Sequence, residues 1–468
     1  MHYYLLSFST CIILFLSLKI WRKTKEVSFL LGIGLIYYWS LLGAWFVVYD
    51  NITGNKGKDF GLHYYYLFEK LFPVEADHIY LYSLALYSLF IIVVQIVILC
   101  FTKKRPDFIQ QEFRPLKINH FLLIAMCIGA VIVSLTMVWR NVLIAAISEQ
   151  SVHLITQQNP DKYFTLHQLL NHTSAVALYI GFISCICGDN ARYINGERKR
   201  FTMLLYVIAI FFVSGYLLFL GNKKEILFGG IIGILFYIQN IKYRINYKWV
   251  ILIITIIIFP LFFNDALRSI SPTFLLEYFQ LEGDYYLETE IVSSGFTVKN
   301  AASTFLFSNE MFCAHFSMYG ILYYDIPLTY GSSFVSLFAS IVPRILWTDR
   351  PEGIYQYYTY YLDVYHKQGF TIHHASGWYL NFGVPGLIAG AFMLGLIWSF
   401  FYNHLHIIQT NKKLFLKIIF IIGLATFTAQ IPALIRCGPE GYKALVFEAL
   451  LLPAIVLYIA AKFHKSRK

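Results

Sequence analysis

Long apolar stretches dominate this chain and decide what it can fold into. About twenty consecutive apolar residues are enough to cross a bilayer as a helix. Such stretches lie at residues 3–21, 28–49, 79–102, 119–139, 168–188, 201–221, 225–240, 249–265, 378–402, 414–434 and 444–461. Only 13% of the 468 residues are charged, about half the usual share in soluble domains. We therefore predict an all-α, polytopic membrane protein with about eleven transmembrane helices.

The charged residues divide the gaps between these stretches into two alternating sets. Lys and Arg concentrate in the odd-numbered gaps and in the C-terminal tail, whereas most Asp and Glu lie in the other gaps. Because short cytoplasmic segments are enriched in Lys and Arg, this pattern predicts an extracytoplasmic N-terminus and a cytoplasmic C-terminus. The net charge of +11 is then a topology signal and not a nucleic-acid-binding signature. The first stretch lacks a basic start and a small-residue cleavage site, so we predict a retained helix there.

One gap on the predicted outer side is much longer than the others. It covers residues 266–377, and its stretches 303–325 and 331–347 are apolar enough to dip into the membrane or cross it. If both cross, the number of transmembrane helices becomes thirteen and the predicted sidedness stays the same. Without internal repeats or linker-like tracts, the chain is expected to form one integral domain, 1–468, containing the 266–377 loop.

Several basic residues lie on the side that the positive-inside rule disfavours. Lys223 and Lys224 occupy a short turn, where snorkelling toward headgroups and anion binding are both open explanations. Arg268 could simply pair with Asp265, three residues earlier. Between the last two stretches, a Gly-Pro-Glu-Gly turn should hold three charged side chains together. These are Arg436, Glu440 and Lys443.

The long gap contains two further groups of candidate residues. Arg344 and Arg350 flank Trp347, and arginine side chains bind phosphate in a bidentate manner while an indole offers a stacking face. A solvated loop with an interfacial tryptophan is the alternative. His373 and His374 precede a stretch interrupted by Gly, Asn and Pro. Either histidine could act as a general base or could bond a loop carbonyl, whereas a metal site has little support.

Together these cations form a set near the predicted outer membrane surface. Such a set suits a lipid-linked diphosphate, whose pyrophosphate lies at headgroup level and whose sugars project outward. Arginine side chains could stabilise the departing pyrophosphate. The sequence carries no Walker-type or Gly-rich nucleotide-binding motif, and a substrate already activated as a diphosphate needs no ATP.

Three motifs resemble the O-antigen polymerase (Wzy-type) family of bacterial repeat-unit polymerases. They are Tyr330-Gly331-Ser332-Ser333-Phe334; Val342-Pro343-Arg344 with Trp347 and Arg350-Pro351; and Gly377-Trp378-Tyr379-Leu380-Asn381-Phe382-Gly383 with Gly386. The short Gly/basic turn at 221–224 and the late Arg436 turn are also similar to that family, as is the arrangement of spans around one large late outer loop.

The resemblance implies a membrane glycosyltransferase C-like fold and a metal-independent activity without cofactors. It implies polymerisation of undecaprenyl-diphosphate-linked oligosaccharides at the outer face of the bacterial inner membrane, giving O-antigen, capsule or exopolysaccharide. Essential arginines are a family theme, which we transfer to Arg344 and Arg436 and less directly to Arg350. A chain-length regulator and a flippase of the same pathway are the partners that it implies.

Two other functions remain open. An O-antigen ligase would share this architecture but transfer the glycan to a different acceptor. A transporter or flippase of lipid-linked oligosaccharides usually shows two similar halves and helices interrupted at the membrane midplane. We expect neither feature here, because the polar residues gather at one surface and in one loop, and we therefore favour an enzyme.

Overall fold

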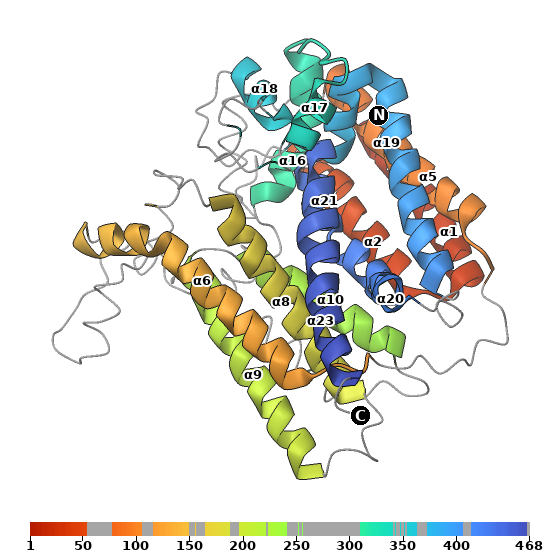
Figure 1. Ribbon diagram of the computed structural model, residues 1–468. Helices are drawn as coiled ribbons and strands as arrows, with labels where there is room; N and C mark the ends of the chain where they lie inside the picture. Colours follow the sequence, from red (N-terminus) through yellow and green to blue (C-terminus); the bar gives the residue numbers. More distant parts are fainter. Residues whose placement is uncertain are drawn as a thin grey trace. The chain divides into compact units, whose positions relative to one another are not determined.

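The computed structural model is built from helices packed along their length (Figure 1). It describes residues 1–53, 77–104, 116–148, 155, 164–187, 196–220, 223–240, 251, 255, 309–339, 342, 347, 351, 353–362, 372–405 and 413–465. Within these ranges the only β-type pairing is an isolated parallel bridge between Ile372 and Cys437.

Eight helices in the described ranges are long and apolar enough to cross a bilayer. They are His2–Thr24, Val27–Tyr49, His78–Phe101, His120–Ile147, Leu166–Cys187, Lys199–Phe219, His374–Leu405 and Gly438–His464. Each coincides with a predicted stretch, which confirms a polytopic helical membrane protein.

The remaining predicted stretches differ in length or lie outside the described ranges. Within 225–240 and 414–434 the structure places shorter apolar helices, Glu225–Gln239 and Leu414–Ala429. The second stops before residue 434 because a new helix, α21 (Ile431–Arg436), starts there with Pro432 in its first turn. Proline fits the first turn of a helix, where its missing N–H is not needed. The stretch 249–265 falls almost wholly outside the described residues.

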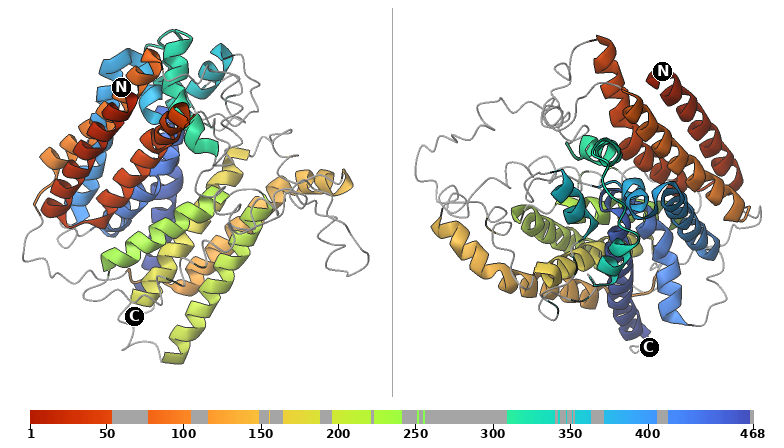
Figure 2. Two further views of the ribbon diagram at one scale, coloured as in Figure 1. Left: turned by 180° about the vertical axis from the view of Figure 1, so that it is seen from behind. Right: turned by 90° about the horizontal axis from the view of Figure 1, so that it is seen from above.

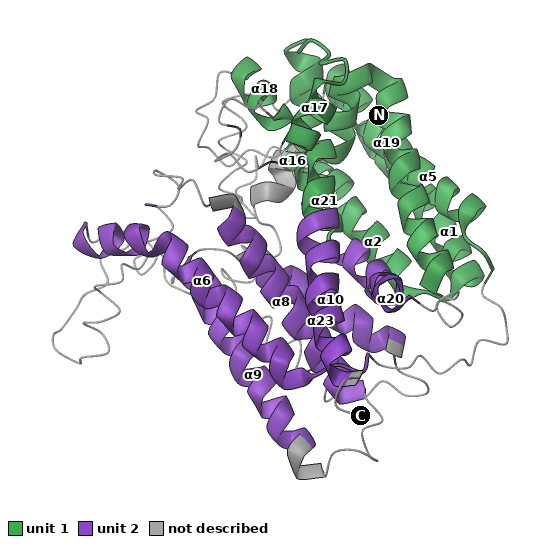
Figure 3. Cartoon of the chain, viewed as in Figure 1, with its two compact units in different colours: residues 1–109, 297–409, 430–445 green, residues 110–296, 410–429, 446–468 purple. Residues whose placement is uncertain are grey.

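The chain forms two compact units, each assembled from three separate segments (Figure 3). Unit 1 comprises Met1–Ile109, Thr297–Gln409 and Gln430–Leu445, and unit 2 comprises Gln110–Phe296, Thr410–Ala429 and Val446–Lys468. The one integral domain expected from the sequence is therefore internally divided, and the chain enters each unit more than once.

Three long helices of unit 1 run parallel to one another: α1 (His2–Thr24), α5 (His78–Phe101) and α19 (His374–Leu405) (Figures 1 and 2). At their beginnings, the His2 ring bonds the Asp77 carbonyl at 2.8 Å. At their ends, Lys23 Nζ donates to the Leu99 carbonyl and Asn403 Nδ2 to the Phe101 carbonyl. The predicted membrane topology requires this shared direction, because it places the start of all three helices on the outer side. We call the end where the three helices begin the outer end, after its predicted orientation.

The second span of unit 1 changes helix type on its way. It consists of α2 (Val27–Tyr37), a π-helical turn η1 (Tyr38–Leu42) and α3 (Gly43–Thr53). The ring contact between Tyr3 and Trp45 shows that it runs antiparallel to α1, because the start of α1 meets the later part of the span. Single π-turns inside α-helices are frequent at functional sites.

Short helices complete the outer end of unit 1. The predicted loop contributes α16 (Asn309–Tyr323), α17 (Ser332–Ala339) and α18 (Ile354–Tyr361). The chain after α21 adds η5 (Gly438–Glu440) and α22 (Gly441–Lys443). As described, α16 has 15 residues and α17 has 8, so their lengths of about 22 and 12 Å fall short of a bilayer core.

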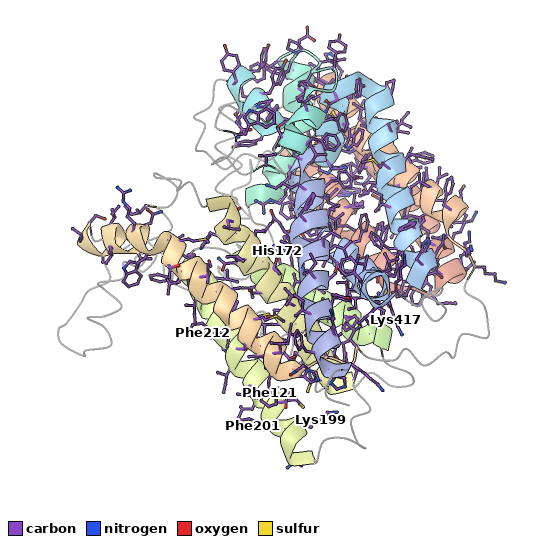
Figure 4. The ribbon with its side chains drawn as sticks, in the orientation of Figure 1. Phe121, His172, Lys199, Phe201, Phe212 and Lys417 are labelled. Atoms are coloured by element: carbon purple, nitrogen blue, oxygen red, sulfur yellow. The ribbon has the colours of Figure 1, made fainter. Side chains whose placement is uncertain are left out.

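Unit 2 packs around one central helix. This is α8 (Phe164–Cys187), surrounded by α6 (His120–Ile147), α9 (Gly196–Phe219), α10 (Lys223–Asn240) and α23 (Leu452–Lys465). The start of α6 lies beside α9, since the His120 ring bonds the Tyr206 hydroxyl at 2.9 Å. Figure 4 shows Phe121, Lys199 and Phe201 at that same end. Lys199 there donates to the last turn of α8, so a basic residue marks the end predicted to be cytoplasmic.

Candidate functional site

The helix that carries the predicted histidines is broken. Within α19, Phe382 and Gly383 leave the helical conformation, with φ of −142° and +66°, and Pro385 follows. Gly383 suits the left-handed value because it has no Cβ. The break lies near the start of α19, at its outer end, and the sequence did not predict it. The apolar character of the segment continues through the break, so hydropathy does not reveal it.

The segment before the break folds back against the segment after it. The Trp378 indole lies directly over Gly390, where an added Cβ would come within 2.4 Å of the ring. In a straight helix, twelve residues would separate these positions by about 18 Å. Gly386 faces the Trp378 carbonyl in the same way, at 2.3 Å from an added Cβ. Glycine at both positions is what allows the two segments to touch.

The polar groups exposed by the break are bonded by the turn before α17. The Thr329 amide donates to the Leu380 carbonyl at 2.8 Å, which otherwise lacks its helical partner. Asn381 accepts from the Ser333 hydroxyl at 2.8 Å and donates to the Gly377 carbonyl at 2.7 Å. The turn and the folded-back segment thus form one rigid body within the outer end.

His373 caps the start of α19 and ties it to the π-helical turn. The Ala375 amide donates to His373 Nδ1 at 3.0 Å, so Nδ1 carries no proton. The other nitrogen, Nε2–H, then donates to Ser40 Oγ at 2.8 Å. Both side chains are fully buried, and burial lowers the pKa of His373 well below its ordinary value, with a further lowering from His374 and His315. His373 is therefore neutral at pH 7, with both nitrogens engaged.

His374 joins the same helix start to the late turn of unit 1. Trp378 Nε1–H donates to His374 Nε2 at 3.0 Å, so the proton of the ring resides on Nδ1. Nδ1–H donates to the Gly438 carbonyl at 2.9 Å. The Tyr442 ring packs against the imidazole at a centroid distance of 5.3 Å. These contacts favour a structural role for both histidines over the predicted role of general base, which stays a prediction.

The late turn presents the predicted Arg436 and Glu440. The Arg436 guanidinium lies 5.8 Å from the centre of the Trp39 ring, a cation–π distance, and the residue is only partly buried. Glu440 Oε1 accepts from the Ile354 amide at 2.7 Å, which bonds the first free N–H of α18. A carboxylate at this position also favourably meets the positive end of the helix.

The structure brings together five of the predicted residues. His373, His374, Arg436, Glu440 and the partly exposed Lys443 all belong to the outer end of unit 1. Within residues 343–350 the structure describes only Trp347, which is 42% exposed. Lys223 and Lys224 open α10 in unit 2, but their side chains lie outside the described part, as do Arg268, Arg344 and Arg350 entirely.

The sequence reasoning missed two clusters of buried polar side chains, one in each unit. In unit 1, the Tyr87 hydroxyl bonds Ser376 Oγ at 2.9 Å, and Ser317 Oγ receives the His373 amide at 3.0 Å. Their serines look unremarkable in the sequence, and no signal there identifies them.

In unit 2, five neighbouring polar residues of α8 are buried: His167, Asn171, His172, Thr173 and Ser174. Figure 4 shows His172 in the interior, well away from Lys199. Polar residues inside a membrane span are rare and often functional. The run from His167 to Ser174, inside an otherwise apolar stretch, was a usable signal.

The fold and this site define a polytopic helical membrane protein with a polar, tightly bonded outer end. No protein-family model, curated protein or solved structure matches the chain.

Proposed function

We propose that this protein polymerises polyprenyl-diphosphate-linked oligosaccharide repeat units into a surface polysaccharide. The reaction would take place at the outer face of the bacterial cytoplasmic membrane. In this reaction an acceptor sugar hydroxyl attacks the anomeric carbon of the growing chain. A new glycosidic bond forms, the bond to the diphosphate breaks, and the hydroxyl proton leaves with the polyprenyl diphosphate.

The observation that carries the proposal is the placement of Arg436. This cation lies partly exposed over Trp39, just before a turn bonded to α18 and α19, and the charge pattern of the sequence predicts an outer position for it. A guanidinium held in this way would stabilise negative charge that develops on a departing pyrophosphate, without reorganising during the reaction. Lys443, in the same short segment, adds a second cation.

The rest of the proposed substrate site comes from the sequence. Arg344 and Arg350 would bind the diphosphate with Arg268, Lys223 and Lys224. Trp347 would stack on a sugar. His373 and His374 are retained here as residues that hold the site in shape.

One observation supports a transporter or flippase as the second candidate. The break at Phe382–Gly383 interrupts α19 near its outer end, and substrate sites of transporters are typically built from interrupted helices, although at the membrane midplane. No observation specifically favours a ligase-type transferase.

Gene disruption separates these functions by what accumulates. Loss of a polymerase leaves single-repeat products, loss of a ligase leaves full-length unattached chains, and loss of a flippase traps precursors in the cytoplasm.

The site itself is tested by Arg436→Ala in the complemented strain. We expect it to abolish long chains, because the charge on the leaving diphosphate loses its partner. Losses of about 100-fold are typical when one such group is removed. Arg436→Lys, which keeps the charge, should retain short chains. Membrane insertion is checked by immunoblotting, and a normal ladder of bands in Arg436→Ala would contradict the proposal.

A further inference from the structure

Six tyrosines form a surface at the outer end of unit 1. This tyrosine surface comes from the end of α16, the turn that follows it, and α18. Its members are Tyr323, Tyr324, Tyr330, Tyr357, Tyr360 and Tyr361. Tyr330 is 78% exposed and Tyr360 is 70% exposed, although large aromatic side chains usually contribute to a protein core.

The three tyrosine rings that α18 contributes to this surface are held in place by neighbours. The Tyr357 hydroxyl donates to the Pro327 carbonyl at 3.1 Å, which joins α18 to the turn after α16. The Tyr357 and Tyr361 rings lie 4.9 Å apart, and Tyr360 meets Tyr361 edge-on at 5.6 Å. A surface already ordered in this way loses little conformational entropy when a ligand binds.

One of these tyrosines has an energetically unfavourable backbone conformation. Tyr330 has a φ of +47°, followed by Gly331 at +92°. A bulky residue in the left-handed region is uncommon, and such strain persists where the surrounding structure imposes it, often at ligand sites. Here the Thr329 amide is bonded to the Leu380 carbonyl, which fixes the turn and leaves the Tyr330 ring pointing away from the core.

The surface is connected directly to the segment that carries Arg436. Glu440, four residues after Arg436, bonds the first amide of α18. Because α18 has eight residues, it is about 12 Å long, so its tyrosines lie a short distance from that segment. A ligand whose charged group contacts Arg436 would therefore extend its outward part toward the tyrosine surface.

The residue types identify the kind of ligand. Ring faces favour apolar C–H surfaces, and phenol hydroxyls can donate and accept hydrogen bonds. A helix that inserts into a membrane interface carries Lys or Arg on its polar face and Trp, Phe or Leu on its apolar face. By contrast, α18 buries Ile354, Tyr358 and the following Leu362, and its exposed residues are Tyr360 and Tyr361. A carbohydrate, which has both C–H faces and hydroxyls, matches this surface better than a lipid.

We infer that the tyrosine surface binds the oligosaccharide part of the lipid-linked substrate, outward of its diphosphate. This inference rests on the proposed function, because it takes the substrate class from there. It adds a glycan subsite on α16, α18 and their connecting turn, distinct from the cations.

Saturation-transfer NMR on the purified full-length protein tests the inference. The probe is the single oligosaccharide repeat that mild acid releases from the lipid-linked pool of the source cells, so it carries no diphosphate. We expect Tyr360→Ala/Tyr361→Ala to bind it at least about tenfold more weakly than the wild type, as two ring contacts are lost. Tyr360→Phe/Tyr361→Phe keeps the rings and should bind within about threefold of the wild type.

A matched control is Tyr4→Ala, which removes an equally exposed tyrosine from α1 (76% exposed). Unchanged binding in the alanine double variant would overturn the inference, and so would an equal loss in Tyr4→Ala. The proposed function is decided separately, by the chain lengths that Arg436→Ala produces in cells. A normal ladder there, with tyrosine-dependent glycan binding in vitro, would refute the polymerase and leave the glycan subsite standing.

Discussion

Replacing His373 can distinguish its structural role, which rests on two hydrogen bonds, from its predicted role as a general base. His373→Ala leaves two buried polar groups without their partners, the donating Ala375 amide and the accepting Ser40 hydroxyl oxygen. An unsatisfied buried donor or acceptor costs about 1–3 kcal/mol, so the variant should lose about 2–6 kcal/mol of unfolding free energy. His373→Asn should recover part of this loss, since asparagine at a helix start accepts from the following amides.

The stability of the wild type should also depend on pH through this residue. The folded-state pKa of His373 lies well below the ordinary 6.5, so the unfolded chain takes up the proton first. Its contribution is therefore complete above pH 6.5 and is lost as the pH falls toward the folded-state pKa. The loss should grow as the pH falls below 6.5, and it should be absent in both variants because neither side chain titrates there.

Thermal unfolding in detergent micelles between pH 7 and 5 measures both effects. The same pH dependence in the wild type and in His373→Asn would refute a buried, neutral His373. Polysaccharide banding completes the test, because asparagine cannot act as a base near neutral pH. If His373→Asn folds normally yet makes no long chains, the result supports His373 as the general base and contradicts a purely structural role.

Three further predictions follow from contacts at the outer end. Glu440→Ala should destabilise the protein by about 0.5–2 kcal/mol, measured by thermal unfolding, because α18 loses the acceptor for its first amide; Glu440→Gln, which keeps an oxygen, should lose less. Gly390→Ala should destabilise by about 1–3 kcal/mol, since the new methyl group would overlap the Trp378 ring. Gly34→Ala, where a Cβ would meet no atom within 4 Å, should by the same measurement be neutral or stabilise by up to about 1 kcal/mol, because alanine favours the helix. Cys437 is exposed, so a membrane-impermeant maleimide should label the protein in intact cells. The Cys437→Ser variant should be labelled less, and equal labelling of the two would place this turn on the cytoplasmic side of the membrane.

The spans were predictable because hydropathy depends on composition along one stretch. Their ends were less so. The stretch predicted at 119–139 stops at the polar Arg140, yet α6 continues to Ile147. Backbone hydrogen bonds continue past one polar side chain, and Asn141 is itself buried against other helices. Conversely, α20 (Leu414–Ala429) ends before the predicted residue 434, because Pro432 starts a new helix although the apolar run continues.

The sequence could indicate which residues of the late turn lie near one another, but not which distant residues they contact. The Gly-Pro-Glu-Gly turn indicated that Arg436 and Glu440 lie close together, since the local sequence decides this. By contrast, His373 meets Ser40 across 333 positions of the chain, and Arg436 meets Trp39 from a π-helical turn inside an apolar span. Hydropathy treats those residues as lipid-facing or buried alike, so one sequence cannot pair them.

The segmented make-up of unit 1 has a consequence for biosynthesis. Its first segment leaves the ribosome early, but Gln430–Leu445 emerges only near the end of translation. Until then, His374 lacks the Gly438 carbonyl and α18 lacks Glu440. The nascent chain must therefore wait in the membrane with polar groups uncovered, where a chaperone or insertase can bind them. A stop codon just before residue 430 would leave the earlier spans of unit 1 in place but its outer end unfinished, so late truncations should be degraded as readily as early ones.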